Sequence, residues 1–188
     1  MHHTLKFYSK NRENILRLYI FFGRLTRIPL LGRLVRRVAN RWSGLHNAYL
    51  LTSAEAGELV NIAEGVARTE CSCRKVFHKC DFPVDNEILL GPTRHIFEEA
   101  LPEDSQEIDK ETALSIIADS HRRGLILTTI QCRGDYYAIC SCCSCCCVPL
   151  RLNKQFGIGK ALIRHKDIVR MFRDYQQHLL ANSSHPHH

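Results

Sequence analysis

The chain has 188 residues, 45% of them hydrophobic and 24% charged, and its formal net charge is +7. This length suits one medium domain with an extension, or two small domains. The longest apolar runs, such as residues 18–22, are too short to span a bilayer, and the N-terminal region lacks the pattern of a signal peptide. We therefore expect a cytoplasmic protein, in a reducing compartment where cysteines serve metal binding or catalysis more often than disulfides.

The positive charge is concentrated near the N-terminus. Residues 1–42 contain ten Lys and Arg residues and one acid, which gives +9, whereas residues 43–188 contain sixteen against eighteen, which gives −2. Because the basic residues are local, the composition does not favour a wholly basic nucleic-acid-binding domain. Nucleic acid is therefore not an expected partner.

The basic segment, residues 12–42, mixes arginine with leucine, isoleucine, phenylalanine and valine, and Pro29 and two glycines predict several short helices. We interpret residues 1–45 as a basic amphipathic N-terminal arm. Such an arm could pack on its own domain. It could also lie on an anionic membrane, at the inner face, or bind an acidic partner, and DNA is a further alternative.

Two helices are well signalled in the next part of the chain. Thr52 and Glu55, three residues apart, form a capping box before the apolar stripe of a helix over residues 53–64. Asp109 is the candidate N-cap of a second helix over residues 111–123. These two helices are expected to pack together and to support the cysteine-containing loops.

A β-hairpin is predicted after the second helix, because two β-rich runs flank Arg133-Gly134-Asp135. Residues 160–180 predict a C-terminal helix, and the His-rich residues 176–188 are interpreted as a flexible tail. The fold class is therefore α+β, mainly helical with a small β-hairpin. We expect residues 46–175 to form one domain that includes the C-terminal helix, in which the cysteine-containing loops gather around an iron–sulfur site.

Ten cysteines are the most unusual feature of the sequence, and nine of them fall into two groups. The first group is Cys71, Cys73 and Cys80, and the second group is Cys140, Cys142, Cys143, Cys145, Cys146 and Cys147. Cys132 stands alone in the hairpin, where a small buried side chain is the simplest interpretation. All nine grouped cysteines are candidate metal ligands.

Several kinds of thiol chemistry compete for this pattern. Adjacent cysteines cannot easily bridge one another, which disfavours a disulfide framework. A structural zinc site needs four ligands, commonly from paired C-x2-C elements, and six thiols in eight residues exceed that need. Soft thiolates also suit Cu(I), but the folded apolar context is not that of a metallothionein.

An iron–sulfur centre fits best, because it requires several thiolates in one small volume. Cys140, Cys143 and Cys146 match the first three ligands of the bacterial ferredoxin pattern C-x2-C-x2-C-x3-C-P, and Leu150 occupies the fourth position. We therefore expect the first cysteine group to complete the ligand set. One or two four-iron four-sulfur (4Fe-4S) clusters are predicted, with zinc as the fallback.

Cations beside the cysteines support an anionic centre, since they favour deprotonated thiols. Arg74, Lys75, Lys79 and Arg133 are neighbours of cysteines in the sequence. We assign Arg74 and Arg133 as residues that contact the cofactor. His78 is interpreted as a hydrogen-bonding neighbour and not as a metal ligand.

The elements CSCR, CDFPVDNEILLG and YAICSCCSCCC, in this order over roughly residues 50–150, resemble a little-described group of ferredoxin-like iron–sulfur proteins from anaerobic microbes. That family has C-x-C-R, Cys-Asp-x-Pro and I-C-N-C-C-x-C-C-C elements. Two positions depart from the pattern: residues 85–87 stand where some relatives have a cysteine, and Ser141 replaces a common asparagine. The resemblance implies 4Fe-4S clusters and electron transfer.

We expect a redox protein that passes electrons to or from a partner protein, as a carrier or as an auxiliary subunit of a reductase. The sequence shows no Gly-rich phosphate loop, nucleophile motif or paired catalytic carboxylates, so an enzyme is not the first expectation. One alternative is an iron–sulfur or zinc redox sensor that binds DNA, with the second helix and the hairpin as part of a winged helix. A structural zinc module for protein interaction is the other.

Overall fold

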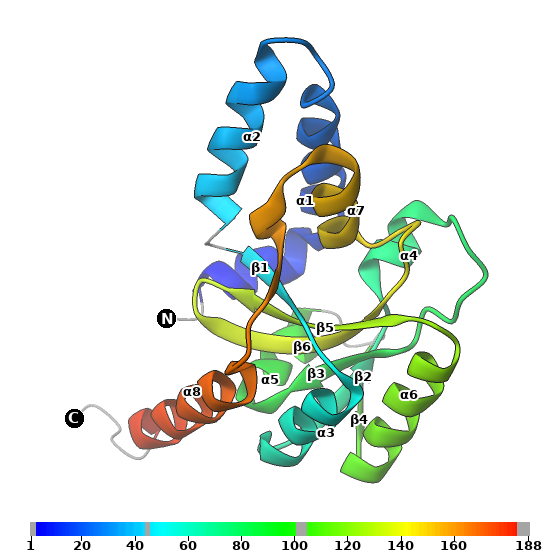
Figure 1. Ribbon diagram of the computed structural model, residues 1–188. Helices are drawn as coiled ribbons and strands as arrows, with labels where there is room; N and C mark the ends of the chain where they lie inside the picture. Colours follow the sequence, from blue (N-terminus) through cyan, green and yellow to red (C-terminus); the bar gives the residue numbers. More distant parts are fainter. Residues whose placement is uncertain (1–2, 44–45, 101–104, 184–188) are drawn as a thin grey trace.

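The computed structural model describes residues 3–43, 46–100 and 105–183, and one seven-stranded sheet forms its centre (Figure 1). The strands are β1 (His46–Leu50), β2 (Val66–Thr69), β3 (Glu87–Leu90), β4 (Ser105–Ile108), β5 (Ile126–Cys132), β6 (Asp135–Cys142) and β7 (Leu162–Arg164). Their order across the sheet is β4-β2-β3-β6-β5-β1-β7. Neighbouring strands are antiparallel except for β1 and β7, which run parallel.

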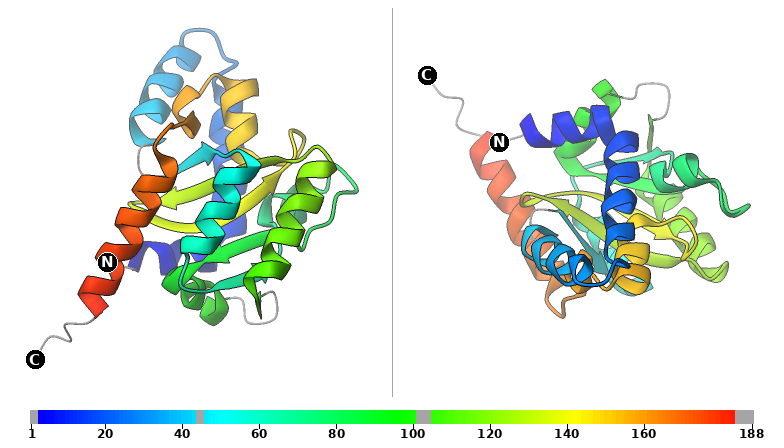
Figure 2. Two further views of the ribbon diagram at one scale, coloured as in Figure 1. Left: turned by 60° about the horizontal axis from the view of Figure 1, so that its bottom comes forward. Right: turned by 90° about the horizontal axis from the view of Figure 1, so that it is seen from above.

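Helices cover both faces of this sheet (Figure 2). The helices are α1 (His3–Leu25), α2 (Leu31–Trp42), α3 (Ser53–Ile62), α4 (Ser72–Phe77), α5 (Arg94–Ala100), α6 (Lys110–Arg122), α7 (Val148–Phe156) and α8 (Ile168–Ser183). One core cluster joins the sheet to α3, α6 and α8, and a second joins the opposite face to α1, α5 and α7. The protein is therefore a three-layer α+β structure.

The predicted α+β class is confirmed, but the predicted small hairpin is wrong in extent, because it is only the centre of a much larger sheet. The hairpin itself forms as β5 and β6. Arg133 and Gly134 both have positive φ, 50° and 98°, as a two-residue type I′ turn requires. The missed strands β1 to β4 have only four or five residues each, too few for a clear alternating pattern.

The two helices predicted from their capping residues are confirmed as α3 and α6. The Thr52 hydroxyl accepts a hydrogen bond from the Glu55 amide at 3.2 Å, and the Glu55 carboxylate accepts one from the Thr52 amide at 2.7 Å. Asp109 accepts a hydrogen bond from the Thr112 amide at 2.7 Å. Local side-chain contacts fix both helix starts, so they could be recognised without tertiary information.

The C-terminal segment differs from its prediction in two ways. Residues 162–164 form the edge strand β7 beside β1 instead of the start of a helix, so the helical segment begins only at α8. α8 continues through Ser183, and Gln176 is only 4% exposed. The prediction of a flexible tail is therefore wrong for residues 176–183, which are helical. The rest of the predicted tail, residues 184–188, lies outside the described residues.

The N-terminal segment packs on the rest of the domain, as in the first interpretation of the basic arm. Leu5, Tyr8, Arg12, Leu16 and Ile20 recur at helical spacing along α1, and all five are buried against the sheet or α7. The glycines do not break the helices as predicted: one lies within α1 and another within α2, and the break falls between Leu25 and Leu31, around Pro29. α2 and the end of α1 form a helical hairpin that projects beyond the sheet beside α7 (Figure 1).

Candidate metal centre

Strand β6 delivers the dense cysteine segment to the sheet face that α1 covers. Cys140 and Cys142 are two residues apart, so their side chains point to the same face, where both are buried. That face is selected by a β-bulge: Gln131 pairs with Tyr136 but Ile130 pairs with Ala138. The extra residue reverses the facing of every later side chain of β6, and without it both cysteines would point toward α3 and α6.

After β6 the chain turns sharply, and four sulfur atoms meet there. The sulfurs of Cys80, Cys143, Cys145 and Cys146 all lie within 4.8 Å of one another. We call these four residues the thiol quartet. The Sγ atom of Cys80 lies 3.5 Å from that of Cys143 and 3.7 Å from that of Cys146. This arrangement could hold a metal ion, with one ligand from the first cysteine group and three from the second.

The remaining grouped cysteines, the thiol quintet, lie next to the quartet at the start of two helices and the end of β6. The quintet is Cys71, Cys73, Cys140, Cys142 and Cys147. Cys71 is the N-cap of α4 and Cys147 the N-cap of α7. The amide of Val148 donates to the Cys73 sulfur at 3.5 Å, which joins the two helix starts.

Hydrogen bonds between thiols set their protonation. Hydrogen bonds from Cys140 and Cys147 hold the pKa of Cys142 well below its usual range. Cys147 hydrogen-bonds to Cys142 and Cys73, and these contacts together with burial raise its pKa well above the usual range. In the quartet, burial raises the pKa of Cys143, but hydrogen bonds from Cys145, the Cys146 amide and Cys80 outweigh it and lower the pKa on balance. Each set therefore contains one thiol, Cys142 or Cys143, that loses its proton more readily than an ordinary cysteine.

Arg74 lies between the quartet and the quintet and is 1% exposed. Its Nη1 atom donates to the carbonyls of Pro83 and, at 2.9 Å, of the Asn86 side chain, and its Nη2 atom donates to the main-chain carbonyl of Ser141. Burial alone would lower the pKa of Arg74, but negative charge on Cys71 and the other neighbouring thiols raises it. Arg74 therefore lies beside both cysteine groups, as its position in the sequence predicted.

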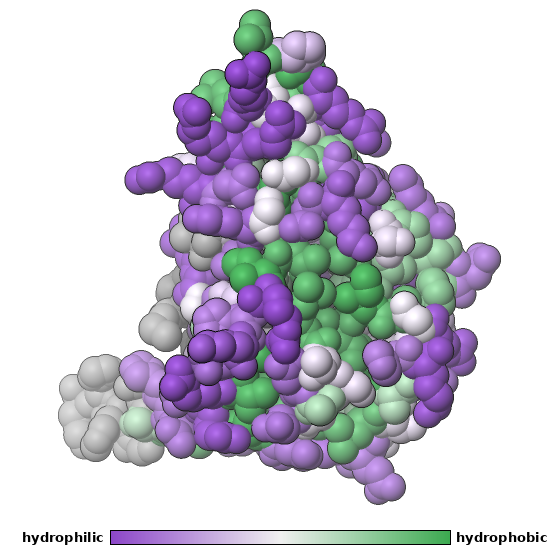
Figure 3. All heavy atoms as spheres, viewed as in Figure 1, coloured by the Kyte–Doolittle hydropathy of each residue, from purple (hydrophilic) through white to green (hydrophobic). Residues whose placement is uncertain are grey.

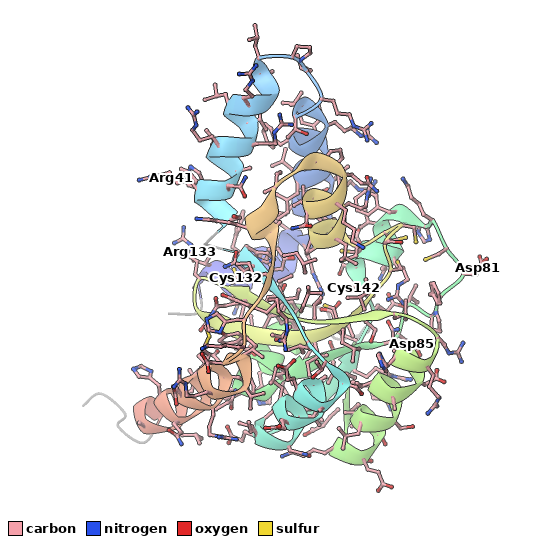
Figure 4. The ribbon with its side chains drawn as sticks, viewed as in Figure 1. Arg41, Asp81, Asp85, Cys132, Arg133 and Cys142 are labelled. Carbon is pink, nitrogen blue, oxygen red and sulfur yellow. The ribbon has the colours of Figure 1, made fainter. Side chains whose placement is uncertain are left out.

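Arg133 does not lie with the cysteine groups, contrary to the prediction. Cys132 pairs with Asp135 at the turn of the hairpin, whereas Cys142 pairs with Ile126 at its other end. Figure 4 shows Cys132 and Arg133 at one end of these strands and Cys142 toward the other. Seven residues of strand separate the two ends by about 20 Å. Arg133 is adjacent in sequence only to Cys132, which is buried in the core on the turn side.

The other predicted neighbours have ordinary structural contacts. The Lys75 side chain forms an ion pair with Glu70 at 2.7 Å. The Lys79 main-chain amide, not its side chain, reaches the quartet and donates to the Cys146 sulfur at 3.3 Å. His78 caps the C-terminus of α4 with φ 42° and ψ 52°, and the quartet does not include it.

A buried ion pair beneath the cysteines was not expected from the sequence. Arg12 of α1 and Glu87 of β3 are 6% and 1% exposed and contact each other. Burial raises the pKa of Glu87, and the Arg12 charge opposes that shift. The signal for Arg12 was its position on the apolar stripe of α1, where a charged residue is rarely buried without a partner. Glu87 gave no comparable signal, because its strand has only four residues.

Comparisons with models of protein families, with curated proteins and with solved structures found no match to this chain. The fold and the quartet define a cysteine-rich α+β protein with a four-thiol site suited to a metal ion. Among the described residues, none of the helices combines the length and the apolar character that crossing a membrane requires.

Proposed function

We propose that this protein binds a 4Fe-4S centre and transfers electrons to or from a partner protein, in the manner of the ferredoxin-like family that its motifs resemble. The observation that carries the proposal is the convergence of all nine grouped cysteines on one region. The quartet alone would satisfy one zinc ion, and the quintet would then have no role. Clusters use several thiolates in a small volume, and the thiols present suffice for one cluster or two.

Three features of the site support such a centre. Cys80 and Cys143 come from segments far apart in the sequence, so binding couples the loop after α4 to the turn after β6. Cys80 and Cys145 are partly exposed, which brings the site close to the surface that a redox partner would approach. Arg74 supplies positive charge and hydrogen bonds that hold both cysteine segments. A bound cluster would supply one-electron transfer.

Structural zinc is a second candidate, and the sulfur spacing favours it. A Zn–S bond of about 2.3 Å in a tetrahedral site places neighbouring sulfurs roughly 3.8 Å apart. The separations of 3.5 and 3.7 Å from Cys80 to Cys143 and Cys146 are close to that value. A cubane cluster spaces its ligand sulfurs more widely, so the quartet would have to open by side-chain rotation to bind one.

The DNA-binding alternative is not proposed. Strands β5 and β6 lie in the interior of the sheet, between β3 and β1, so they cannot form the projecting wing of a winged helix. The outer end of α6 is also not a free basic surface, because Arg122 and Arg123 contact Asp119 at 3.4 and 2.6 Å. Both observations argue against a winged helix in this region.

We also propose that the α1–α2 hairpin rests on an anionic membrane, which would place a cytoplasmic protein at the inner face. Large apolar side chains are exposed along this hairpin: Leu18, Phe21, Phe22, Ile28, Leu30, Leu31, Leu34, Val38 and Trp42. Green hydrophobic spheres appear among purple hydrophilic ones at the tip in Figure 3. Leu30 at the tip is 81% exposed, and exposed apolar surface of this kind is unfavourable in water. Apolar groups ringed by arginines suit an anionic interface.

Elemental analysis decides between the two metals. Protein purified without oxygen should contain iron and acid-labile sulfide and show a broad absorption band in the visible range. Electron paramagnetic resonance of the reduced protein would then separate one cluster from two interacting ones. A colourless protein with stoichiometric zinc would overturn the electron-transfer proposal and support the structural zinc site.

A further inference from the structure

A cavity of about 610 Å³ lies among α1, α2, α7 and the end of β6. Figure 1 shows how these elements are arranged. This volume falls in the range of roughly 300–1,000 Å³ that holds organic ligands. Most of the wall is apolar, with Leu16, Val35, Ala39, Leu152 and Ile158 among the lining residues. The cavity therefore extends beyond the thiols into an apolar region between the helices, and this region is suited to a hydrophobic molecule.

The polar end of the cavity holds the Arg12–Glu87 pair. Nε and Nη1 of Arg12 and Oε2 of Glu87 are buried and have no hydrogen-bond partner in the part of the chain that the structure describes. A buried donor or acceptor without a partner costs about 1–3 kcal/mol. Both residues line the cavity and are more than nine-tenths buried, so these atoms mark a place where a bound molecule completes the hydrogen bonding.

The charges at this end select the head group of that molecule. Arg12 and Glu87 neutralise each other, and Arg74, the other buried cation that lines the cavity, is balanced by the neighbouring thiols and held by three carbonyls. Neither an anion nor a cation therefore gains much net charge attraction there. The free Arg12 donors suit a carbonyl or hydroxyl oxygen. The Glu87 carboxylate has hydrogen bonds with Arg12 and Cys140, and its free Oε2 atom suits a hydroxyl donor. A neutral head with oxygen atoms meets both requirements without bringing another buried charge.

The opposite end of the cavity opens at α2. Leu34, Val38 and Trp42 line the cavity and are also 55%, 48% and 66% exposed. They belong to the same apolar surface that we propose to rest on a membrane. A molecule dissolved in the membrane could therefore enter the cavity without passing through water.

We infer that this cavity binds a neutral amphiphile that has carbonyl or hydroxyl oxygens on its head and an isoprenoid or acyl body. Its head contacts Arg12 and Glu87, and its body lies between α1 and α2. Prenylated quinones and neutral acyl lipids both have this chemistry. All five quintet thiols and two quartet thiols, Cys143 and Cys146, also line the cavity, so its polar end is shared with the candidate metal centre and the head lies beside it. The apolar part of the cavity between α1 and α2 lies apart from these thiols and holds the body of the ligand.

Trp42, the single tryptophan of the chain, reports directly on occupancy because it lines the cavity. Protein purified without oxygen is titrated with a short-chain prenylated naphthoquinone, a quencher of indole fluorescence. We expect saturable quenching at micromolar concentration. Palmitate, which has an anionic head, should compete at least about tenfold more weakly. Competition by a monoacylglycerol would support the inference and identify acyl lipid as a second source of the same chemistry.

Val38→Asp places a charge in the cavity mouth at an exposed position and should weaken quinone binding at least about tenfold. Leu34→Asp repeats the test at a second exposed lining position. Phe7→Asp is the matched control, because Phe7 is 64% exposed and does not line the cavity. The circular dichroism spectrum checks that each variant folds. Linear quenching without saturation, equal binding by Val38→Asp and Phe7→Asp, or tighter binding of palmitate would overturn the inference. None of these results depends on the iron analysis, so the two proposals fail separately.

Discussion

The buried guanidinium of Arg74 donates a hydrogen bond to the main-chain carbonyl of Ser141 and so joins the CSCR segment to the cysteine-rich end of β6. The same side chain donates to Pro83 and Asn86, on the loop that follows Cys80. One cation thus holds the three segments that supply both thiol sets. Removal of its hydrogen bonds should affect folding and metal binding together.

Arg74→Lys tests this role. A lysine ammonium cannot reach all three acceptors in the planar arrangement of a guanidinium, so buried carbonyls lose their partner. We expect the free energy of unfolding to fall by about 2–4 kcal/mol and the metal content to fall with it. Arg68→Lys is the control, because that side chain forms a partly exposed pair with Asp85 at 3.1 Å. Urea unfolding of both variants gives the comparison, and equal losses would argue against a special role for Arg74.

Cys80 is the only member of the thiol quartet from the first cysteine group. Cys80→Ser should therefore remove most of the bound metal, since a neutral hydroxyl is a poor replacement for a thiolate. Cys132→Ser removes a buried thiol at the far end of the hairpin and should keep the metal, with a modest loss of stability. Metal analysis and the absorption spectrum report the difference. Full metal retention by Cys80→Ser would exclude the quartet as the site.

Substitutions of Arg12 and Glu87 should have strongly non-additive effects on the free energy of unfolding. Arg12→Met leaves a buried carboxylate without its cation, and Glu87→Met leaves a buried guanidinium without its anion. Each single substitution should lower the free energy of unfolding by about 3–5 kcal/mol. The double substitution should cost less than their sum, because it leaves no unpaired charge. Additive losses in urea unfolding would show that the two side chains do not act as a pair.

The buried His46 side chain should make the folded protein less stable in mild acid. Burial and the nearby Arg12 charge lower the pKa of His46 to about 4 from an ordinary value of 6.5. Between these two values the unfolded chain binds a proton that the folded chain does not, so the free energy of unfolding falls as the pH falls. Going from about pH 7 to about pH 5 should cost roughly 1–2 kcal/mol more in the native protein than in His46→Phe. If the free energy of unfolding falls by the same amount in both proteins between these pH values, His46 is not the group responsible.

Substitution of Leu30 should weaken membrane binding without lowering the stability of the protein. Leu30→Asn should change the free energy of unfolding little, because the Leu30 side chain is 81% exposed. Binding to vesicles that contain phosphatidylglycerol should fall about tenfold or more, since a fully buried leucine contributes about 1.5–3 kcal/mol. Vesicle sedimentation measures this, with Phe7→Asn as the control. Unchanged binding by Leu30→Asn would remove the hairpin tip from the proposed membrane contact.

The sequence by itself determined the features that depend on nearby residues. Thr52 with Glu55, and Asp109, mark helix starts because a cap is a contact within one turn. The turn at Arg133 and Gly134 follows from the residues between two β-rich runs, and the two cysteine groups are visible as composition. These signals predicted the α+β class and a cysteine site that could hold a metal ion, because each of them is complete within a short segment.

Only the tertiary structure decided which of these parts meet. The bulge at Tyr136 to Ala138 determines the face on which Cys140 and Cys142 lie, and it depends on pairing with β5. Arg133 is a sequence neighbour of a cysteine but lies at the far end of the hairpin, whereas Arg12, far from the cysteines in sequence, lies beneath them. Spacing along the chain does not encode the pairing and packing of distant segments. The division of nine thiols into a quartet and a quintet is therefore a property of the folded chain.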